Sequence, residues 1–293
     1  MTIKKDTKYY VLLLIVLTFS IGYTTLAITS TRATTASVQQ KQVQSIAEIQ
    51  EQETQQRISE VLAYGTQTTK TGTSEVIIYD FIDGSSQTDY FLEENGNRYK
   101  IYFKNKKPKL ISGDRLKIEG VYSGNEIVST WYKIQESALQ TTQDQNIGEQ
   151  RTVVLLVNFA NNPGTPITVN EARNRVFNEQ NFNAITSYIK EVSYTQTFLS
   201  GDVFGWYTLE GNQNCILFTL ATSAMNAANN DVDFLQYDRL IIVFPSTSLC
   251  TYGGLSSLGM INTDTPDGTK NMSIIGINGP NNLDNGVEFY FLA

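Results

Sequence analysis

Apolar residues gather in a few stretches of this chain, and the spacing within each stretch predicts a different element. The first stretch runs from residue 9 to residue 28 and follows three lysines. Its length is close to the roughly 20 residues that cross a bilayer, and it exceeds the about 7–15 apolar residues of a typical signal peptide. Residues 1–30 are therefore either a signal peptide or an uncleaved signal anchor, and both place the rest of the chain outside the cytoplasm.

Two polar segments separate the regions that follow. Residues 31–57 are rich in Gln, Thr, Ser and Glu, which predicts a polar stalk that holds the folded part away from the membrane. Residues 139–150 are also polar and predict a linker. These segments leave two stretches that are expected to fold, residues 58–138 and residues 151–293.

Residues 58–138 show the short alternating pattern of a small β domain. Leu116 and Ile118 alternate with charged residues, as in a strand with one buried face. Asn95 and Gly96 separate two strand-like stretches, and this pair is the strongest short signal for a β-hairpin. Short strands joined by such turns favour an OB-like barrel, a fold that can bind sugars or single-stranded nucleic acid. A spacer or pro-domain is the simpler interpretation, because a fold does not by itself give a function.

Residues 151–293 alternate between strand and helix patterns. The apolar runs at 153–159 and 240–245 have the length of buried strands. Thr168 and Glu171 have the capping-box spacing that starts a helix, and apolar residues at 185, 188, 189 and 192 give that helix one apolar face. The pattern further predicts a helix over 218–228, a loop over 253–259, and strands over 271–277 and 287–292. Such alternation predicts a mixed, largely parallel sheet with helices.

Composition changes this picture only in part. The 293 residues can form one large or two ordinary domains, and a hydrophobic content of 41% is enough for a buried core. The net charge is −7, with 22 lysines and arginines against 29 acidic residues, so we expect no nucleic acid partner. The expected membrane contact is through the N-terminal helix alone.

The two cysteines, Cys215 and Cys250, lie in the last third of the chain. In an exported protein such a pair is expected to form a disulfide. Two buried thiols are the alternative. A catalytic cysteine is a weaker interpretation, because the chain contains no histidine to act as its base.

The region from 151 to 277 resembles the start of the catalytic domain of gametolysin-like zinc metallopeptidases, which are metzincin-type enzymes. That family begins with an apolar strand and continues through S-Y-x-x-E-x-S-Y and T-x-L-x-G-x-V-x-G-W. The matching residues here are Ser187, Tyr188, Glu191, Ser193, Tyr194, Thr197, Leu199, Gly201, Val203, Gly205 and Trp206. A second match follows at Tyr237, Asp238, Arg239, the apolar run 240–245, Cys250 and the loop at 253–259. The expected fold class is therefore α+β or α/β, with an N-terminal transmembrane or signal helix, a small OB-like β domain, and a truncated metzincin-like mixed-sheet domain with helices.

The resemblance implies zinc chemistry that this sequence does not contain. The family binds zinc through H-E-x-x-H-x-x-G-x-x-H on a helix, and the Glu of that motif polarises the zinc-bound water. The chain has no histidine, so we expect no catalytic residue, no metal ligand and no cofactor in it, although zinc belongs to the complete family domain. The acidic pairs Asp231/Asp233, Asp264/Asp267 and Asp284/Glu288 have no third partner and are better explained as loop or cap residues.

The position of the last predicted strand indicates which part of the family domain we expect this sequence to lack. The strand expected at 287–292 stands where the family places the strand before its zinc motif, so we expect the chain to be an N-terminal part of such a peptidase. The strand at 271–277 is expected to be the sheet edge that pairs with extended substrate, through Met272, Ser273, Ile274 and Ile275. An ordinary edge strand covered by the following loop is the alternative.

Two functions remain open on the sequence alone. The first is the N-terminal portion of an exported zinc metalloendopeptidase that acts on peptide or protein substrates when completed and is inactive as this chain. The second is a non-catalytic surface protein, membrane-anchored or secreted, that binds a partner or has a structural role. Both place the protein outside the cell.

Overall fold

The computed structural model describes residues 53–81, 85–104, 107–138, 147–210, 215–250 and 252–279. The expected signal or anchor helix at 1–30, most of the stalk and the strand at 287–292 lie outside these residues. The chain divides into two units, Met1–Arg57 and Ile58–Ala293, and the elements below belong to the second. Its described part is a mixed α+β structure rich in strands, which confirms the broad fold class. None of the described helices is long and apolar enough to cross a membrane.

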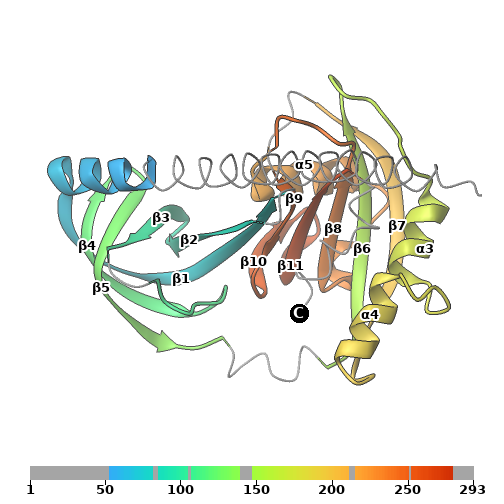
Figure 1. Cartoon of the computed structure of the whole chain (residues 1–293), viewed down its shortest axis with the longest axis horizontal. Coiled ribbons are helices and arrows are strands. Elements are labelled where there is room, and N and C mark those ends of the chain that lie inside the picture. Colours follow the sequence, from blue (N-terminus) through green and yellow to red (C-terminus); the bar gives the residue numbers. More distant parts are fainter. Residues whose placement is uncertain are drawn as a thin grey trace, which may run out of the picture. The chain divides into compact units, whose positions relative to one another are not determined.

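The first five strands form a closed ring. They are β1 (Thr66–Phe81), β2 (Ser86–Glu94), β3 (Asn97–Phe103), β4 (Arg115–Ser123) and β5 (Glu126–Glu136) (Figure 1). β1 pairs with both β2 and β4, β2 pairs with β3, and β5 pairs with β4, all antiparallel, while β3 and β5 pair in parallel. The ring is therefore a small barrel in which β1 is the strand that closes it.

Local signals in the sequence set the turns and the core of this barrel. Asn95 and Gly96 have φ of 53° and 77°, which is the backbone of a tight hairpin turn, so the predicted β2–β3 hairpin is confirmed. Leu116 and Ile118 on β4 are fully buried, as their alternation predicted. Val61 and neighbouring apolar residues of the helix at residues 53–64 pack against Val121 and Val128. This helix begins within the segment predicted as stalk.

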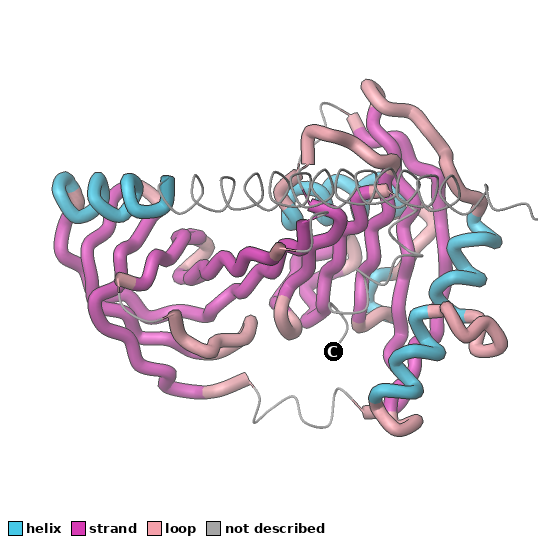
Figure 2. Tube along the Cα trace, in the orientation of Figure 1, coloured by secondary structure: helices cyan, strands magenta, loops and turns pink. Residues whose placement is uncertain are grey.

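The remaining strands form a mixed sheet. They are β6 (Gly148–Phe159), β7 (Thr197–Leu209), β8 (Arg239–Phe244), β9 (Tyr252–Ser257), β10 (Ile261–Thr265) and β11 (Gly268–Asn278). Their order is β9-β11-β8-β6-β7, with β10 paired to the first part of β11. β7, β6, β8 and β11 are parallel neighbours, whereas β9 runs antiparallel to β11. Figure 2 shows these strands side by side. The end of the segment predicted as a linker, from Gly148 onward, is already part of β6.

Helices cover both faces of this sheet. They are α3 (Val169–Phe177), α4 (Ile185–Val192), α5 (Leu217–Ala228) and the short 3-10 turn η1 (Phe234–Gln236). Val153 and Leu155 of β6 pack in one cluster with α5, whereas Val154 and Leu156 pack in another with α3 and α4. Successive residues of a strand point to opposite faces, so the apolar part of β6 from Val153 to Val157 is buried on both of its faces.

The sequence predicted one helix from Thr168 to residue 192, and this prediction is wrong in one respect. The structure has two helices in this range. Thr168 and Glu171 form the predicted capping box at the start of α3. The break follows Asn178, whose side chain accepts a hydrogen bond from the N–H of Gln180, and Asn181 does the same for Asn183. Asparagine side chains that bond to nearby main chain compete with the helix, and here they end it.

Candidate functional site

β1 joins the barrel to the mixed sheet. Its second half pairs with β2 on one side and with β9 on the other. The register with β9 runs from Ile77 opposite Ser257 to Phe81 opposite Tyr252, so β9 is paired at both ends and is interrupted only by a bulge at Gly253. β9 lies at the end of the mixed sheet, and β1 therefore occupies the edge on which an additional strand would otherwise bind.

The prediction that residues 271–277 form the free edge of the sheet is wrong. Met272 pairs with β10, Ser273 and Ile274 pair with β8, and Ile275 lies between β8 and β9. All four residues are buried. The reason is that β9, predicted as a loop, folds back as a strand outside β11 and takes the edge itself. The predicted substrate-pairing residues thus lie on an inner strand.

Small residues let β9 pack closely against β11. Leu255 of β9 lies over Gly276 of β11, where an added Cβ would be 2.9 Å from the Leu255 side chain. The hydroxyl of Ser257 accepts a hydrogen bond from the N–H of Ile274 at 3.1 Å and donates one to the carbonyl of Gly259 at 2.9 Å. Gly276 of β11 and Ser257 of β9 therefore allow the two strands to pack closely.

Hydrogen bonds from the main chain of β1 extend the junction to residues outside β9. The N–H of Leu258 donates to the carbonyl of Val76 at 2.8 Å, and the N–H of Val76 donates to the hydroxyl of Ser112 at 2.9 Å. Main-chain groups of alternate residues on a strand point to the same side. The N–H of Ile78, two residues beyond Val76, therefore points to β9.

Two tyrosines face each other across the junction. The rings of Tyr79 on β1 and Tyr252 on β9 have centroids 5.9 Å apart. Burial raises the pKa of Tyr79 to about 12, helped by the carboxylate of Asp89 and opposed by Arg98. Burial, with a smaller contribution from Tyr79, also raises the pKa of Tyr252 well above its usual range. Both phenols are therefore neutral at any physiological pH.

A disulfide holds the chain just before β9. Cys215 and Cys250 are joined, with their Cα atoms 5.4 Å apart, which confirms the predicted pairing. The hydroxyl of Tyr252 donates to the carbonyl of Cys215 at 2.9 Å. The side-chain amide of Asn278 donates to the carbonyls of Cys250 and Tyr252 at 3.0 and 2.9 Å. These bonds tie the start of α5, the start of β9 and the end of β11 together.

Ser273 has a structural partner. Arg239, which begins β8, is buried and donates to the hydroxyl of Ser273 at 3.0 Å and to the side-chain carbonyl of Gln150 at 2.9 Å. Burial lowers the pKa of the Arg239 guanidinium, although Asp238 opposes this effect. Ser273 thus helps to hold a buried cation inside the sheet.

The residues present do not fit a zinc site. The sequence has no histidine, and the described residues contain no cluster of three or more histidines, cysteines or acidic side chains. Asp231 accepts from Tyr207 at 2.7 Å, Asp233 caps η1, and Asp267 accepts from the N–H of Phe234 at 2.8 Å. These are the loop and cap roles that the sequence indicated. Asp284 and Glu288 lie outside the described residues.

A polar hollow of about 650 Å³ lies beside the junction, between β1, β2 and the β10–β11 hairpin. Its carboxylates are already engaged. Glu75 pairs with Arg98, and Asp264 accepts from the hydroxyl of Thr269 at 2.8 Å. We assign no ligand to this hollow.

The residues that carry the family resemblance have visible structural roles. Gly201 and Gly205 of β7 have φ of 144° and 115°, and an added Cβ would lie 1.8 Å from the carbonyl oxygen of Thr152 and 2.2 Å from that of Leu156. Only glycine fits where β7 crosses β6 so closely. The indole N–H of Trp206 donates to the carbonyl of Ile167 at 2.9 Å. These three motif residues therefore help to build the sheet and hold the loop before α3.

Comparison with models of known protein families gives no match for this chain. Comparison with curated proteins finds no similar sequence either.

Proposed function

We propose that this chain provides the anchor, the barrel and the peptide-holding sheet of an exported, gametolysin-like zinc metalloendopeptidase. The observation that carries the proposal is the ordered set of family residues between Ser187 and Trp206, which fall on α4, the turn after it and β7. Their positions suit a shared sheet, since the glycines among them are required by close strand contacts.

The two folded regions support the same proposal at the level of topology. The closed ring β1-β2-β3-β5-β4 is consistent with the OB-like barrel expected for residues 58–138. The mixed sheet with helices on both faces is consistent with a metzincin-like domain in residues 151–293. A fold shared at this level does not establish an activity.

On this proposal the chain holds peptides and does not cleave them. Catalytic zinc in the family needs histidines, and these residues supply none. What the chain can offer is a strand that pairs with an extended peptide through the main chain. The corrected candidate is β9, the antiparallel strand at the end of the mixed sheet.

In the structure, β1 occupies the position beside β9 that such a peptide would take. Ile77 to Phe81 run antiparallel to β9 and use its outer main-chain groups. A peptide can pair with β9 only when this part of β1 has moved away. Peptide binding on β9 is therefore in competition with closure of the junction.

The compartment is part of the same proposal. A disulfide such as Cys215–Cys250 persists in oxidising environments outside the cytoplasm. The apolar N-terminal stretch provides export, and as an uncleaved anchor it would also provide membrane attachment. We propose that the folded part is extracellular.

The test is binding of a synthetic peptide with the sequence of β1 from Glu75 to Phe81. Ile78→Pro removes the N–H that points to β9, whereas Ile78→Ala keeps it and serves as the matched control. Calorimetry on the full chain should detect saturable binding of the peptide to Ile78→Pro and at most weak binding to Ile78→Ala. Absence of binding to both variants, with both folded, would overturn the peptide-holding role. Zinc-dependent cleavage of a protein substrate by the unmodified chain would overturn the claim that it lacks catalysis.

A second function is favoured by one observation, the pairing of β9 by β1. With that edge closed, the chain suits a non-catalytic surface protein whose mixed sheet is a rigid support. Failure of the β1 peptide to bind Ile78→Pro would favour this function over the first.

A further inference from the structure

The second half of β5 is exposed in a way that the rest of the barrel is not. From Thr130 to Glu136 every residue is exposed, on both faces of the strand. The parallel pairing with β3 ends at Phe103 and Ser129. Beyond that point β5 pairs with β4, and no described residue pairs with its other edge.

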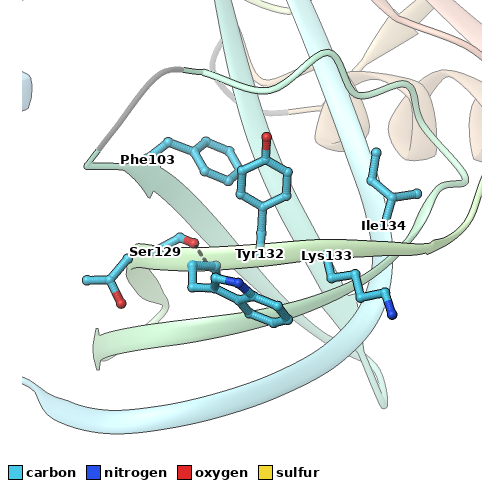
Figure 3. A pocket seen from close by; sticks show the side chains of 7 residues that line it. Phe103, Ser129, Tyr132, Lys133 and Ile134 are labelled. Carbon is cyan, nitrogen blue, oxygen red and sulfur yellow. Dashed lines mark hydrogen bonds between the residues drawn. The ribbon is translucent and has the colours of Figure 1, made fainter.

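A hollow of about 440 Å³ lies beside this edge, where the barrel wall opens between β3 and β5. Phe103, Tyr132 and Ile134 line it together with nearby parts of β5. The rings of Phe103 and Tyr132 meet edge to face with centroids 5.4 Å apart. Figure 3 shows Tyr132 and Ile134 on one side of β5 and Lys133 on the other. The hollow therefore has an apolar wall, in a barrel mouth of the kind that often holds ligands.

Side chains on both faces of β5 are exposed to solvent. Tyr132 and Ile134 are 36% and 37% exposed, although they stand opposite the buried Ile118 and Leu116. Trp131 is 45% exposed and has the same parity as Lys133, so it lies on the opposite face. A ligand that stacks on one face would leave the other face uncovered. A partner strand beside β5 would cover side chains on both faces at once.

Exposed lysines outnumber exposed carboxylates near this edge, in a chain that is negative overall. Lys133 is exposed on β5, and Lys104, Lys107 and Lys109 are exposed in the segment that follows β3. That segment lies near the Phe103 end of the hollow, because Tyr90 donates to the carbonyl of Pro108 and its ring contacts Phe103. With a net charge of −7 for the whole chain, this local excess of lysines over the exposed Glu119 and Glu136 favours an acidic partner.

We propose that the edge of β5 from Trp131 to Glu136, with the hollow beside it, binds an extended acidic peptide as an added strand. Main-chain hydrogen bonds along the edge hold the peptide, and the hollow accepts one of its apolar side chains. The lysines select acidic side chains at the rim. This site is separate from β9 and does not depend on the peptidase proposal.

The test uses Trp131 as a reporter in the full chain. The sequence has two tryptophans, so Trp206→Phe leaves Trp131 as the single one. The probe is an acetylated peptide of alternating valine and glutamate. We expect a saturable blue shift of the Trp131 emission that weakens with added salt. Lys133→Glu should weaken binding by about tenfold, whereas Lys190→Glu, on α4, serves as the matched control and should leave binding unchanged.

Four comparisons make the result decisive. A peptide with lysine in place of glutamate should bind weakly to the unaltered site and better to Lys133→Glu. A peptide with prolines in alternate positions cannot pair as a strand, so equal binding of that peptide would overturn the proposal. A blue shift with polygalacturonate but none with the acidic peptide would assign the site to an acidic glycan instead. Formation of a dimer through this edge in place of peptide binding, detected by light scattering, would also overturn it.

Discussion

Two strand edges of this protein differ in whether another strand pairs with them. β9 contains Gly253, Gly254, Ser256 and Ser257 besides Tyr252 and Leu255, is buried throughout, and pairs with β1. The second half of β5 carries Trp131, Tyr132 and Ile134, yet it is exposed on both faces and described residues pair with it on one side only. Residue type alone therefore does not account for burial at the two edges. Whether a strand edge is paired therefore depends on which other segments of the chain lie beside it.

The largest effect should separate two tyrosines, one from each edge. Tyr252 is buried beside the disulfide, so Tyr252→Ala should cost about 3–5 kcal/mol of unfolding free energy. Tyr132 is partly exposed at the mouth of the barrel, so Tyr132→Ala should cost about 1 kcal/mol or less. Urea unfolding of the two variants measures both values. Equal losses would mean that the β5 edge is covered in solution.

The closed edge should also depend on the disulfide. Cys215 and Cys250 are 35 residues apart, and their bond restrains the chain just before β9. Replacing both by serine should cost about 3–4 kcal/mol, mostly by freeing the unfolded chain. Thermal unfolding of the double variant, and of the parent with and without a reductant, checks this. A variant as stable as the parent would show that the loop before β9 is held by its hydrogen bonds alone.

A smaller effect is expected from the strand that closes β9. Ile78→Pro removes one main-chain donor at the junction and leaves a carbonyl without its partner, at a cost of about 1–3 kcal/mol. Ile78→Ala keeps the donor and removes only partly buried side-chain atoms, so it should cost less. Urea unfolding of both variants measures the difference. Equal costs would contradict the direction assigned to the Ile78 N–H.

The smallest effect concerns alkaline pH. The ordinary pKa of tyrosine is 10.0, and burial raises that of Tyr79 to about 12. Because the neutral phenol is favoured in the folded state, its contribution is fully present below pH 10 and is lost as the pH rises through about 12. Tyr79→Phe should therefore move the alkaline unfolding transition to higher pH, as followed by circular dichroism. An unchanged transition would assign the alkaline loss to other groups.

Local parts of the fold could be predicted from sequence because their causes are local. The turn at Asn95 and Gly96 and the capping box of Thr168 and Glu171 involve residues within a few positions of each other. The Cys215–Cys250 pair follows from the number of cysteines and the expected compartment. Each of these predictions is confirmed.

The two edges could not be predicted, because each is decided by residues far away in the chain. Gly253 and Gly254 favour a loop by local preference, and they form a strand only because β11 and β1 offer partners on both sides. The exposure of Tyr132 depends on where β3 ends, at Phe103, which no pattern within β5 reports. The local pattern favoured a loop at 253–259 and did not indicate which strand edge would be covered.

Hydrogen exchange of the full chain, read by mass spectrometry, tests the contrast between the edges most directly. We predict slow exchange in the segments that contain residues 77–81 and 252–257, whether or not peptide is present. We expect faster exchange in the segment that contains residues 131–136, with slowing when the valine–glutamate peptide is added. Slow exchange at 131–136 without peptide, or no slowing when peptide is added, would contradict an open edge that accepts a strand.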